Sequence, residues 1–399
     1  MKDLKHLIYF EKLLENSNNE LIQQAKSEGK LAVGYTCFHM PEVLLNLDKC
    51  FSVRLRAPKT GSMDIATYYM SNYTCEYCRA LLERAIEGGF NFLDALAGVD
   101  ACAEMNRCME NIELVADLPG EKFFVTHADI PYKVEDFTVK HYVTQIKNRV
   151  LARLHEVYGV DISEESIRRA VDEHNRVCRI ITEIGEYRKL PNPPITGYEF
   201  HVLNMVTYCC PKYLIVDQLQ ETLEEIRTRQ VDTKPWFRAR VAIVGSEIDD
   251  LDMTKLIEDA CALIVADRFC FGSFPGREVI GLNDHEDALT RHYLKVSECP
   301  RFMSDEKIHQ RRETADRLAR EYGAEGIIYE QIKFCDFWGF ERALASHIQA
   351  EEYGHPVLSI DRPYNARTSG QLRTRMQAFV ESLEIKRIQK KKQGGERTC

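Results

Sequence analysis

Residues 78–107 read CRALLERAIEGGFNFLDALAGVDACAEMNR. In residues 78–87 the apolar side chains recur at the i, i+3, i+4 and i+7 spacing of one helix face, and the two glycines that follow end that helix. The apolar run 92–99 then predicts a buried strand, and residues 103–115 predict a second helix. A helix, a strand and a helix in this order are typical of a parallel-sheet α/β unit.

The same alternation continues on both sides of this segment. Short apolar strands are expected at 31–35 and 122–125, and strands alternate with helices again in the C-terminal part of the chain. The sequence therefore predicts an α/β fold, with two parallel-sheet α/β domains and a helical segment between them. The expected parts are an N-terminal helix over 1–30, a first α/β domain over 31–133, a helical segment over 134–235, a second α/β domain over 236–385 and a disordered basic tail over 386–399.

The composition excludes several classes of protein. With 44% hydrophobic and 29% charged residues, the 399-residue chain has the balance of a globular protein of two or three domains. Its formal net charge of −9, without a basic domain, argues against nucleic-acid binding. No run approaches the ~18 apolar residues that span a bilayer, and residues 1–20 lack the apolar stretch of a signal peptide. We therefore expect a cytoplasmic protein without nucleic-acid or membrane partners.

The fourteen cysteines are the unusual part of this composition. In a reducing compartment, and in a chain long enough to bury its own core, disulfides are the least expected use for them. Most of these cysteines lie in apolar or helical stretches and are expected to pack in the core. The others are candidates for chemistry that uses thiolates.

Three of the cysteines share one kind of position. Cys78 opens a predicted helix, Cys102 follows a predicted strand and precedes a helix, and Cys335 does the same in the second domain. Ligands gather beyond the carboxyl ends of strands in open α/β sheets, and helix N-termini stabilise thiolates there. The pattern predicts that the three thiolates converge on one electron-poor centre. The alternative is that each cysteine packs in a separate core.

The residues leave the nature of this centre open. Zinc would need a fourth ligand, and the chain has a single CxxC, formed by Cys75 and Cys78, and no HExxH. An iron–sulfur cluster with three cysteines would leave one iron open for catalysis. Cys75 fits either a further ligand or a neighbour of the site. Cys108 lies on the same side of its predicted helix as apolar residues, which favours a packing role in the core. Cys270 is a further candidate ligand because it ends a predicted strand.

Four stretches resemble the 2-hydroxyacyl-CoA dehydratase and benzoyl-CoA reductase family. They are residues 78–107, 324–341 (AEGIIYEQIKFCDFWGFE), 354–365 (GHPVLSIDRPYN) and 370–384 (GQLRTRMQAFVESLE). The family's three cluster-ligating cysteines fall on Cys78, Cys102 and Cys335. The resemblance implies a [4Fe-4S] cluster, a second cluster-bearing subunit that is homologous or identical, and a separate ATP-hydrolysing iron–sulfur activator. The absence of a GxxxxGK[ST] loop in this chain agrees with a separate activator.

The resemblance implies an oxygen-sensitive lyase. Such an enzyme removes water from a 2-hydroxyacyl-CoA through a ketyl radical and yields a 2-enoyl-CoA. The alternatives are an ATP-dependent low-potential reductase, of the benzoyl-CoA or double-cubane type, and a non-catalytic electron-relay subunit. Val244-Gly245-Ser246 stands where double-cubane members have a Gly-Cys-Pro turn, and this difference weakens the double-cubane alternative. Cys270 does match one of the additional cysteine positions of those members, and Cys75 and Cys108 could take the place of the missing cysteines. The sequence assigns no catalytic acid or base; Glu42 and Glu247 lie near predicted strand ends.

Overall fold

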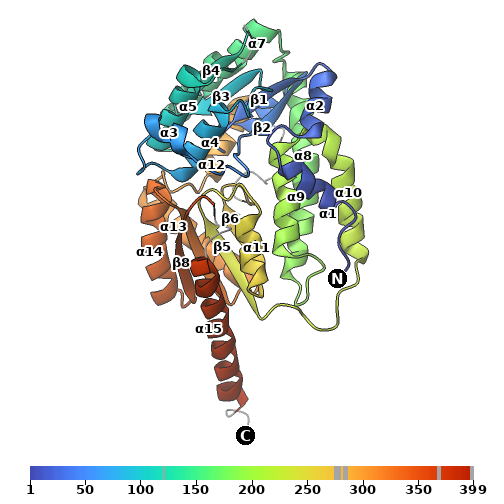
Figure 1. Cartoon of the computed structure of the whole chain (residues 1–399), viewed down its shortest axis with the longest axis vertical. Helices are drawn as coiled ribbons and strands as arrows, with labels where there is room; N and C mark the ends of the chain where they lie inside the picture. Colours follow the sequence, from blue (N-terminus) through green and yellow to red (C-terminus); the bar gives the residue numbers. More distant parts are fainter. Residues whose placement is uncertain (119, 121, 274–279, 282–285, 366–369, 396–399) are drawn as a thin grey trace.

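The chain folds around two parallel β-sheets of four strands each (Figure 1). The computed structural model describes residues 1–118, 120, 122–273, 280–281, 286–365 and 370–395. The first sheet has the order β2-β1-β3-β4 and consists of β1 (Leu31–Tyr35), β2 (Cys50–Arg54), β3 (Ala95–Val99) and β4 (Phe124–Ala128). The second has the order β6-β5-β7-β8 and consists of β5 (Ala239–Gly245), β6 (Ala262–Phe269), β7 (Gly326–Ile332) and β8 (Val357–Arg362). The predicted α/β fold with two parallel-sheet domains is confirmed.

Helices flank both sheets and form the segment between them (Figure 1). Those up to the end of the first sheet are α1 (Leu7–Leu14), α2 (Glu20–Ser27), η1 (Glu42–Leu45), α3 (Asp64–Tyr69), α4 (Glu76–Ile86) and α5 (Ala103–Val115). The segment between the sheets contains α6 (Asp136–Gln145), η2 (Ile146–Leu151), α7 (Ala152–Tyr158), α8 (Glu164–Glu186), η3 (Tyr187–Lys189), α9 (Gly197–Cys209) and α10 (Lys212–Thr228). The second domain adds α11 (Asp252–Asp259), α12 (Glu286–Val296), α13 (Asp305–Glu321), α14 (Asp336–Glu351) and α15 (Gly370–Gly395). Of the helices in the described ranges, none combines the length and the apolarity needed to cross a bilayer.

The two sheets have the same strand connectivity. In each, the second strand in sequence pairs with one side of the first strand, and the third strand pairs with its other side. Such a reversal opens a crevice beyond the carboxyl ends of the first and third strands, where open α/β sheets bind ligands. The fold therefore provides one such position in each domain, next to β3 and next to β7.

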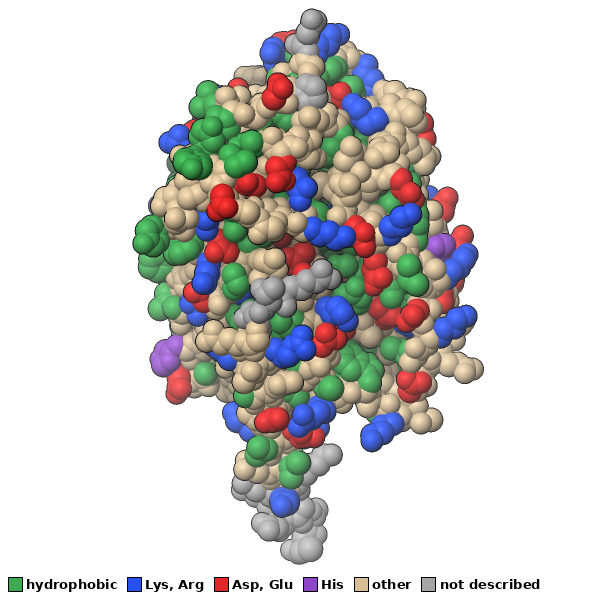
Figure 2. All heavy atoms as spheres, viewed as in Figure 1, with side chains coloured by type: hydrophobic (Ala, Val, Ile, Leu, Met, Phe, Trp, Pro, Cys, Tyr) green, Lys and Arg blue, Asp and Glu red, His purple; other side chains and the backbone are tan. Residues whose placement is uncertain are grey.

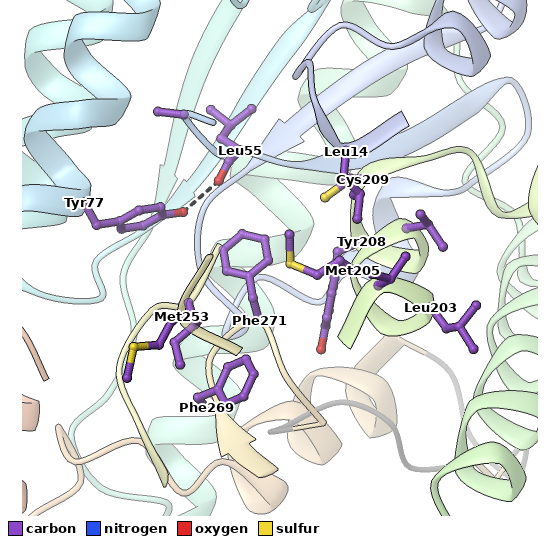
Figure 3. Packing of buried hydrophobic residues seen from close by; sticks show 14 of the residues in the cluster. Leu14, Leu55, Tyr77, Leu203, Met205, Tyr208, Cys209, Met253, Phe269 and Phe271 are labelled. Atoms are coloured by element: carbon purple, nitrogen blue, oxygen red, sulfur yellow. Dashed lines mark hydrogen bonds between the residues drawn. The ribbon is translucent and has the colours of Figure 1, made fainter. Parts of the chain in front are cut away.

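One hydrophobic core connects the two domains and the helices between them (Figure 3). Phe271, just after β6, packs edge-on against Tyr77 of α4 and Tyr208 of α9, with ring centroids 6.3 and 5.8 Å apart. The Tyr77 hydroxyl donates a hydrogen bond to the Leu55 carbonyl oxygen at 2.7 Å. Because these side chains come from both domains and from the helical segment, their close packing holds one sheet in position relative to the other.

The N-terminal part differs from its prediction, because residues 1–30 form two short helices and not one. Asn19 caps the second helix: its side-chain oxygen accepts the backbone N–H groups of Leu21 and Ile22 at 3.1 and 3.2 Å. The polar run 16–19 (NSNN) favours a cap over a continuous helix, since short polar side chains compete for backbone hydrogen bonds.

The C-terminal tail also differs from its prediction of disorder over 386–399. Residues 386–395 continue α15, and residues 396–399 lie outside the described ranges. Arg387 forms an ion pair with Glu325, with 3.2 Å between Nη1 and Oε1. Lys, Gln and Arg are good helix formers, so a helix that starts on the packed domain can extend through this basic stretch.

Strand β2 was not predicted. Its sequence, CFSVR, mixes polar and apolar residues, yet all five residues are buried. Polar side chains on a buried strand need partners from elsewhere in the fold, and a local sequence pattern does not show them. This strand places Arg54 at the carboxyl end of the first sheet, which matters for the site described next.

Candidate metal centre

Cys102 and Cys335 occupy equivalent positions in the two domains. β3 ends at Val99 and β7 at Ile332, so each cysteine is the third residue beyond its strand. Each is also the N-cap residue of the helix that follows, α5 or α14. Both cysteines therefore combine a crevice position with a helix N-terminus, where backbone N–H groups and the helix dipole favour a thiolate.

The start of α4 contributes two more cysteines. Cys75 is the N-cap residue of α4, and Cys78 lies in its first turn, so residues three apart share one side of the helix. The backbone N–H of Glu76 donates to the Lys333 carbonyl oxygen at 3.3 Å, and the Tyr73 and Phe334 rings pack edge-on at 5.7 Å. The start of α4 in the first domain therefore lies directly on the β7–α14 loop of the second.

The structure brings four thiols together. The Cys75 thiol lies beside the thiols of Cys335 and Cys78, and the Cys78 thiol also lies beside that of Cys102. Cys75 and Cys78 are buried, whereas Cys102 and Cys335 are half-buried. The three cysteines predicted as ligands thus lie in one cluster with Cys75. We call these four residues the thiol centre.

Electrostatics within the thiol centre favour one thiolate. Hydrogen bonds from the Cys335 and Cys78 thiols, and then from the backbone N–H groups of Cys78 and Tyr77, hold the pKa of Cys75 well below its usual range. The pKa of Cys78 is raised by its bonds to Cys102 and Cys75, and the pKa of Cys335 is raised by its bond to Cys75. The neighbouring thiols therefore act as donors to the Cys75 sulfur.

Cys108 and Cys270 take different positions. The buried Cys108 thiol donates to the Cys78 carbonyl oxygen at 3.1 Å, so it supports the first turn of α4. Cys270 lies among other groups: its electrostatic neighbours are Glu247, Arg54 and two further cysteines, Cys37 and Cys299. Cys108 therefore contacts the backbone of the thiol centre through its thiol, and Cys270 lies with a different set of residues.

A buried ion pair joins the carboxyl ends of the two sheets. Arg54, at the end of β2, pairs with Glu247, which follows β5, with 3.2 Å between Nη2 and Oε1. The Arg54 guanidinium also lies over the Phe271 ring, 4.1 Å from its centroid. Burial raises the pKa of Glu247 to about 7, although Arg54 opposes the shift. This carboxyl can therefore hold or release a proton near neutral pH, and sequence reasoning missed its partner Arg54 because it missed β2.

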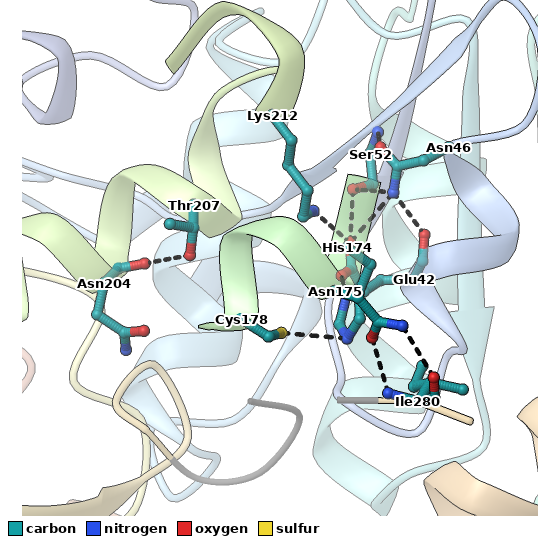
Figure 4. A network of polar contacts seen from close by, with 10 residues as sticks. All are labelled: Glu42, Asn46, Ser52, His174, Asn175, Cys178, Asn204, Thr207, Lys212 and Ile280. Atoms are coloured by element: carbon teal, nitrogen blue, oxygen red, sulfur yellow. Dashed lines mark hydrogen bonds and ion pairs between the residues drawn. The ribbon is translucent and has the colours of Figure 1, made fainter. Parts of the chain in front are cut away.

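Glu42, the other carboxylate noted in the sequence, belongs to a closed polar network (Figure 4). Its carboxylate accepts from Lys212 Nζ at 2.7 Å and from Ser52 Oγ at 2.9 Å, and it pairs with His174 Nδ1 at 3.2 Å. Burial opposes ionisation of Glu42, but Lys212 and His174 hold its pKa well below its usual range. A fully paired, buried carboxylate ties η1 to α8 and α10, and this arrangement favours a structural role.

The donor chemistry of the thiol centre suits an iron–sulfur cluster. Among the residues that the structure describes, no group of three or more His, Cys, Asp or Glu side chains has the arrangement of a site for a single metal ion. A cubane has a different requirement, because each cysteine binds its own iron at a separate corner of the cluster. The thiols here come from both domains and from the starts of three different helices, so they are suited to bind separate irons of one cluster.

Comparisons with known proteins agree with the resemblance seen in the sequence. The model of the family described as 2-hydroxyglutaryl-CoA dehydratase, D-component, matches residues 37–383, which include the whole thiol centre. The beta subunit of (R)-phenyllactyl-CoA dehydratase from Clostridium sporogenes is 24% identical, over 94% of this chain and 97% of that protein. The beta subunit of (R)-2-hydroxyglutaryl-CoA dehydratase from Acidaminococcus fermentans is 23% identical, over 92% and 96%. A putative dehydratase subunit of Escherichia coli K12, YjiM, is 23% identical, over 74% and 75%.

Proposed function

Because the chain belongs to the family of the 2-hydroxyglutaryl-CoA dehydratase D-component, we propose that it is the iron–sulfur, beta-type subunit of a 2-hydroxyacyl-CoA dehydratase. The proposed enzyme is a lyase that removes water from a 2-hydroxyacyl-CoA and forms a 2-enoyl-CoA. The observation that carries the proposal is the thiol centre, in which loops of both domains bring their cysteines to one place.

Cys78, Cys102 and Cys335 would hold a [4Fe-4S] cluster in this proposal. When bound, such a cluster supplies a single electron at low potential. The chain itself contributes the placement of these ligands, because the N-termini of α4, α5 and α14 meet at the thiols. Burial of Cys75 and Cys78 keeps water away from that side of the site. A separate ATP-hydrolysing activator would deliver the electron, since this chain has no phosphate-binding loop of its own.

A partner subunit is expected, because two of the relatives named above are beta subunits. Apolar side chains of α3, of the loop before α4 and of α14 are exposed: Tyr68 of α3 is 89% exposed, Tyr73 81%, and Phe340 and Leu344 of α14 67% and 57%. Figure 2 shows hydrophobic side chains gathered along the left edge of the molecule, level with α3 and α14 in Figure 1. We assign this face, defined by the four residues above, to the partner subunit, because exposed apolar patches of this kind mark protein contacts.

Iron and sulfide analysis of the anaerobically purified protein tests the proposal. One cubane per chain predicts about four irons and about four sulfides per chain. The variant Cys335→Ala should lose the cluster. Its matched control is Cys50→Ala, because Cys50 is a buried cysteine at the first residue of β2, the end of the strand away from the thiol centre. Less than about one iron per native chain, or equal iron in the two variants, would contradict the proposal.

A further inference from the structure

A cleft of about 720 Å³ lies between α6, α12 and α13. Its walls come from residues 132–135 at the start of α6, from Lys295 in the last turn of α12 and from residues at the start of α13. This volume is within the range of cavities that bind small molecules and cofactors. The cysteines of the thiol centre are not among its lining residues, so the cleft is a second candidate site on this chain.

Three lysine side chains line this cleft, those of Lys133, Lys295 and Lys307. Lys133 and Lys295 are exposed, whereas Lys307 is half-buried. The Lys307 Nζ donates to the carbonyl oxygens of Lys295 and Ser297 at 2.9 and 3.3 Å, so it ties the end of α12 to the start of α13. Three ammonium groups around one cleft favour an anionic ligand, and so do the N-termini of α6 and α13.

A buried arginine beside the cleft adds to this positive charge. Arg301 is 2% exposed, and within the described part of the chain its guanidinium donates only to carbonyl oxygens. These belong to Asp100 at 3.1 Å and to Ile130 and Pro131 at 3.4 Å, and the Nε has no partner. A buried charge ordinarily has a charged partner, and a charge in a medium of low dielectric acts over a longer distance than one in water. The uncompensated charge of Arg301 therefore also favours an anion in the cleft.

Arg301 also supports an aromatic wall of the cleft. Its guanidinium lies over the Tyr132 ring, 4.3 Å from the centroid. Tyr132 lines the cleft and is 64% exposed, so one face of its ring is backed by a cation and the other is left for a planar ligand group. The bond from Arg301 to Asp100, two residues before Cys102, connects this wall to the β3–α5 loop of the thiol centre.

Carboxylates in the cleft narrow the class of ligand. Glu135, Glu306 and Glu313 line it together with the lysines. Carboxylates accept hydrogen bonds from hydroxyl and amino groups, and they repel a ligand that carries negative charge alone. A nucleotide has phosphates, ribose hydroxyls and a planar base, so it matches lysines, carboxylates and an aromatic ring in one cleft.

A second cleft with basic residues has a different setting. It has a volume of about 960 Å³ and lies at the C-terminal ends of α13 and α14, where Gly323 and Gly354 line it. Helix C-termini favour cations and disfavour anions, so the basic side chains of this cleft are accounted for without a ligand. Its lysines, Lys386 and Lys390, therefore serve as a control for those of the first cleft.

We propose that the cleft between α6, α12 and α13 binds the adenosine phosphate end of a CoA thioester, with Lys133 and Lys295 on the phosphates and Tyr132 stacked on the adenine. This inference rests on the proposed function, which supplies the CoA thioester, and deepens it by assigning a nucleotide site to this chain. The flexible arm of CoA separates its phosphates from its thioester, so the acyl group need not lie in this cleft. Free ATP carries the same chemical groups, and the test separates the two sources.

Isothermal titration calorimetry of the anaerobically purified full chain tests the site with three ligands. These are CoA, adenosine 3′,5′-bisphosphate, which lacks the thiol of CoA, and ATP. CoA and the bisphosphate should bind, and ATP should bind more weakly than CoA. Absence of binding by CoA overturns the inference, and so does tighter binding of ATP than of CoA.

Variants locate the binding site. Lys133→Ala combined with Lys295→Ala should weaken CoA binding about 10-fold or more, because charge-assisted contacts to phosphate are lost. Lys386→Ala combined with Lys390→Ala changes the net charge equally and should bind CoA like the native chain; equal affinity of the two double variants overturns the inference.

The aromatic contact has its own test. Tyr132→Ala should weaken binding of the bisphosphate about 5-fold or more, and Tyr132→Phe should keep the native affinity because the ring remains. Equal weakening by both substitutions contradicts stacking on the ring. A native chain that contains iron but binds no CoA sinks this inference only, whereas a chain that binds CoA but contains no iron sinks the proposed dehydratase function and leaves the nucleotide site in place.

Discussion

At the scale of single residues, the Arg54–Glu247 pair shows how burial changes an ordinary side chain. A carboxyl whose pKa in the folded protein is about 7, against an ordinary value of 4.5, binds a proton more tightly in the folded than in the unfolded chain. Its contribution to stability is therefore fully present below about pH 4.5 and is lost as the pH rises towards 7.

The residue-scale prediction is that Glu247→Gln weakens this pH dependence. The free energy of unfolding of the native protein should fall between about pH 4.5 and pH 7, by an amount on the order of 3 kcal/mol from this carboxyl. The variant should lose that part of the slope, because an amide does not titrate. Asp249 and Glu258, whose pKa values burial raises to about 6 and about 7, stay in both proteins, so the variant should keep part of the pH dependence. Denaturant unfolding at a series of pH values measures the difference, and parallel curves would refute the assignment.

At the scale of secondary-structure elements, the Glu42 network ties η1 to α8 and α10. Removing one partner of a buried ion pair leaves an uncompensated charge and typically costs about 3–5 kcal/mol. Lys212→Met removes the ammonium that lies 2.7 Å from Glu42 Oε2, so it should destabilise the protein by that order. Lys255→Met is the matched control, because Lys255 and its partner Asp259 are largely exposed. Chemical denaturation of both variants checks the prediction; a loss of stability as small as that of the control would show that the network is not a stabilising contact.

At the scale of the whole molecule, the apolar face over α3 and α14 should control assembly. Phe340→Asp and Tyr68→Glu place charges on side chains that are 67% and 89% exposed, so the fold should tolerate them. Each charge would be buried in the subunit contact, and loss of a central aromatic contact commonly weakens association about 30-fold or more. Sedimentation of the chain isolated with its partner subunit measures the effect. Ile8→Asp is the control, because Ile8 is 70% exposed on α1, outside this face; equal weakening by all three variants would count against the assignment.

The features that the sequence predicted well are local ones. Alternation of apolar runs with helix signals predicted both parallel-sheet domains, because a buried parallel strand and an amphipathic helix each have a short-range pattern. The same reasoning found Cys102 and Cys335, since a cysteine between a strand and a helix is visible without knowledge of the fold. It missed β2, because the polar residues of that strand are satisfied by partners far away in the chain.

The sequence by itself therefore determined the class of fold and which cysteines stand at strand ends. Only the tertiary structure decided which side chains meet. It placed Cys75 beside Cys335 and Cys270 near Arg54 and Glu247, and it directed the Cys108 thiol to a backbone carbonyl oxygen of α4. The physical reason is that helix and strand patterns depend on neighbours within a few residues, whereas these contacts depend on how the shared core holds one sheet against the other.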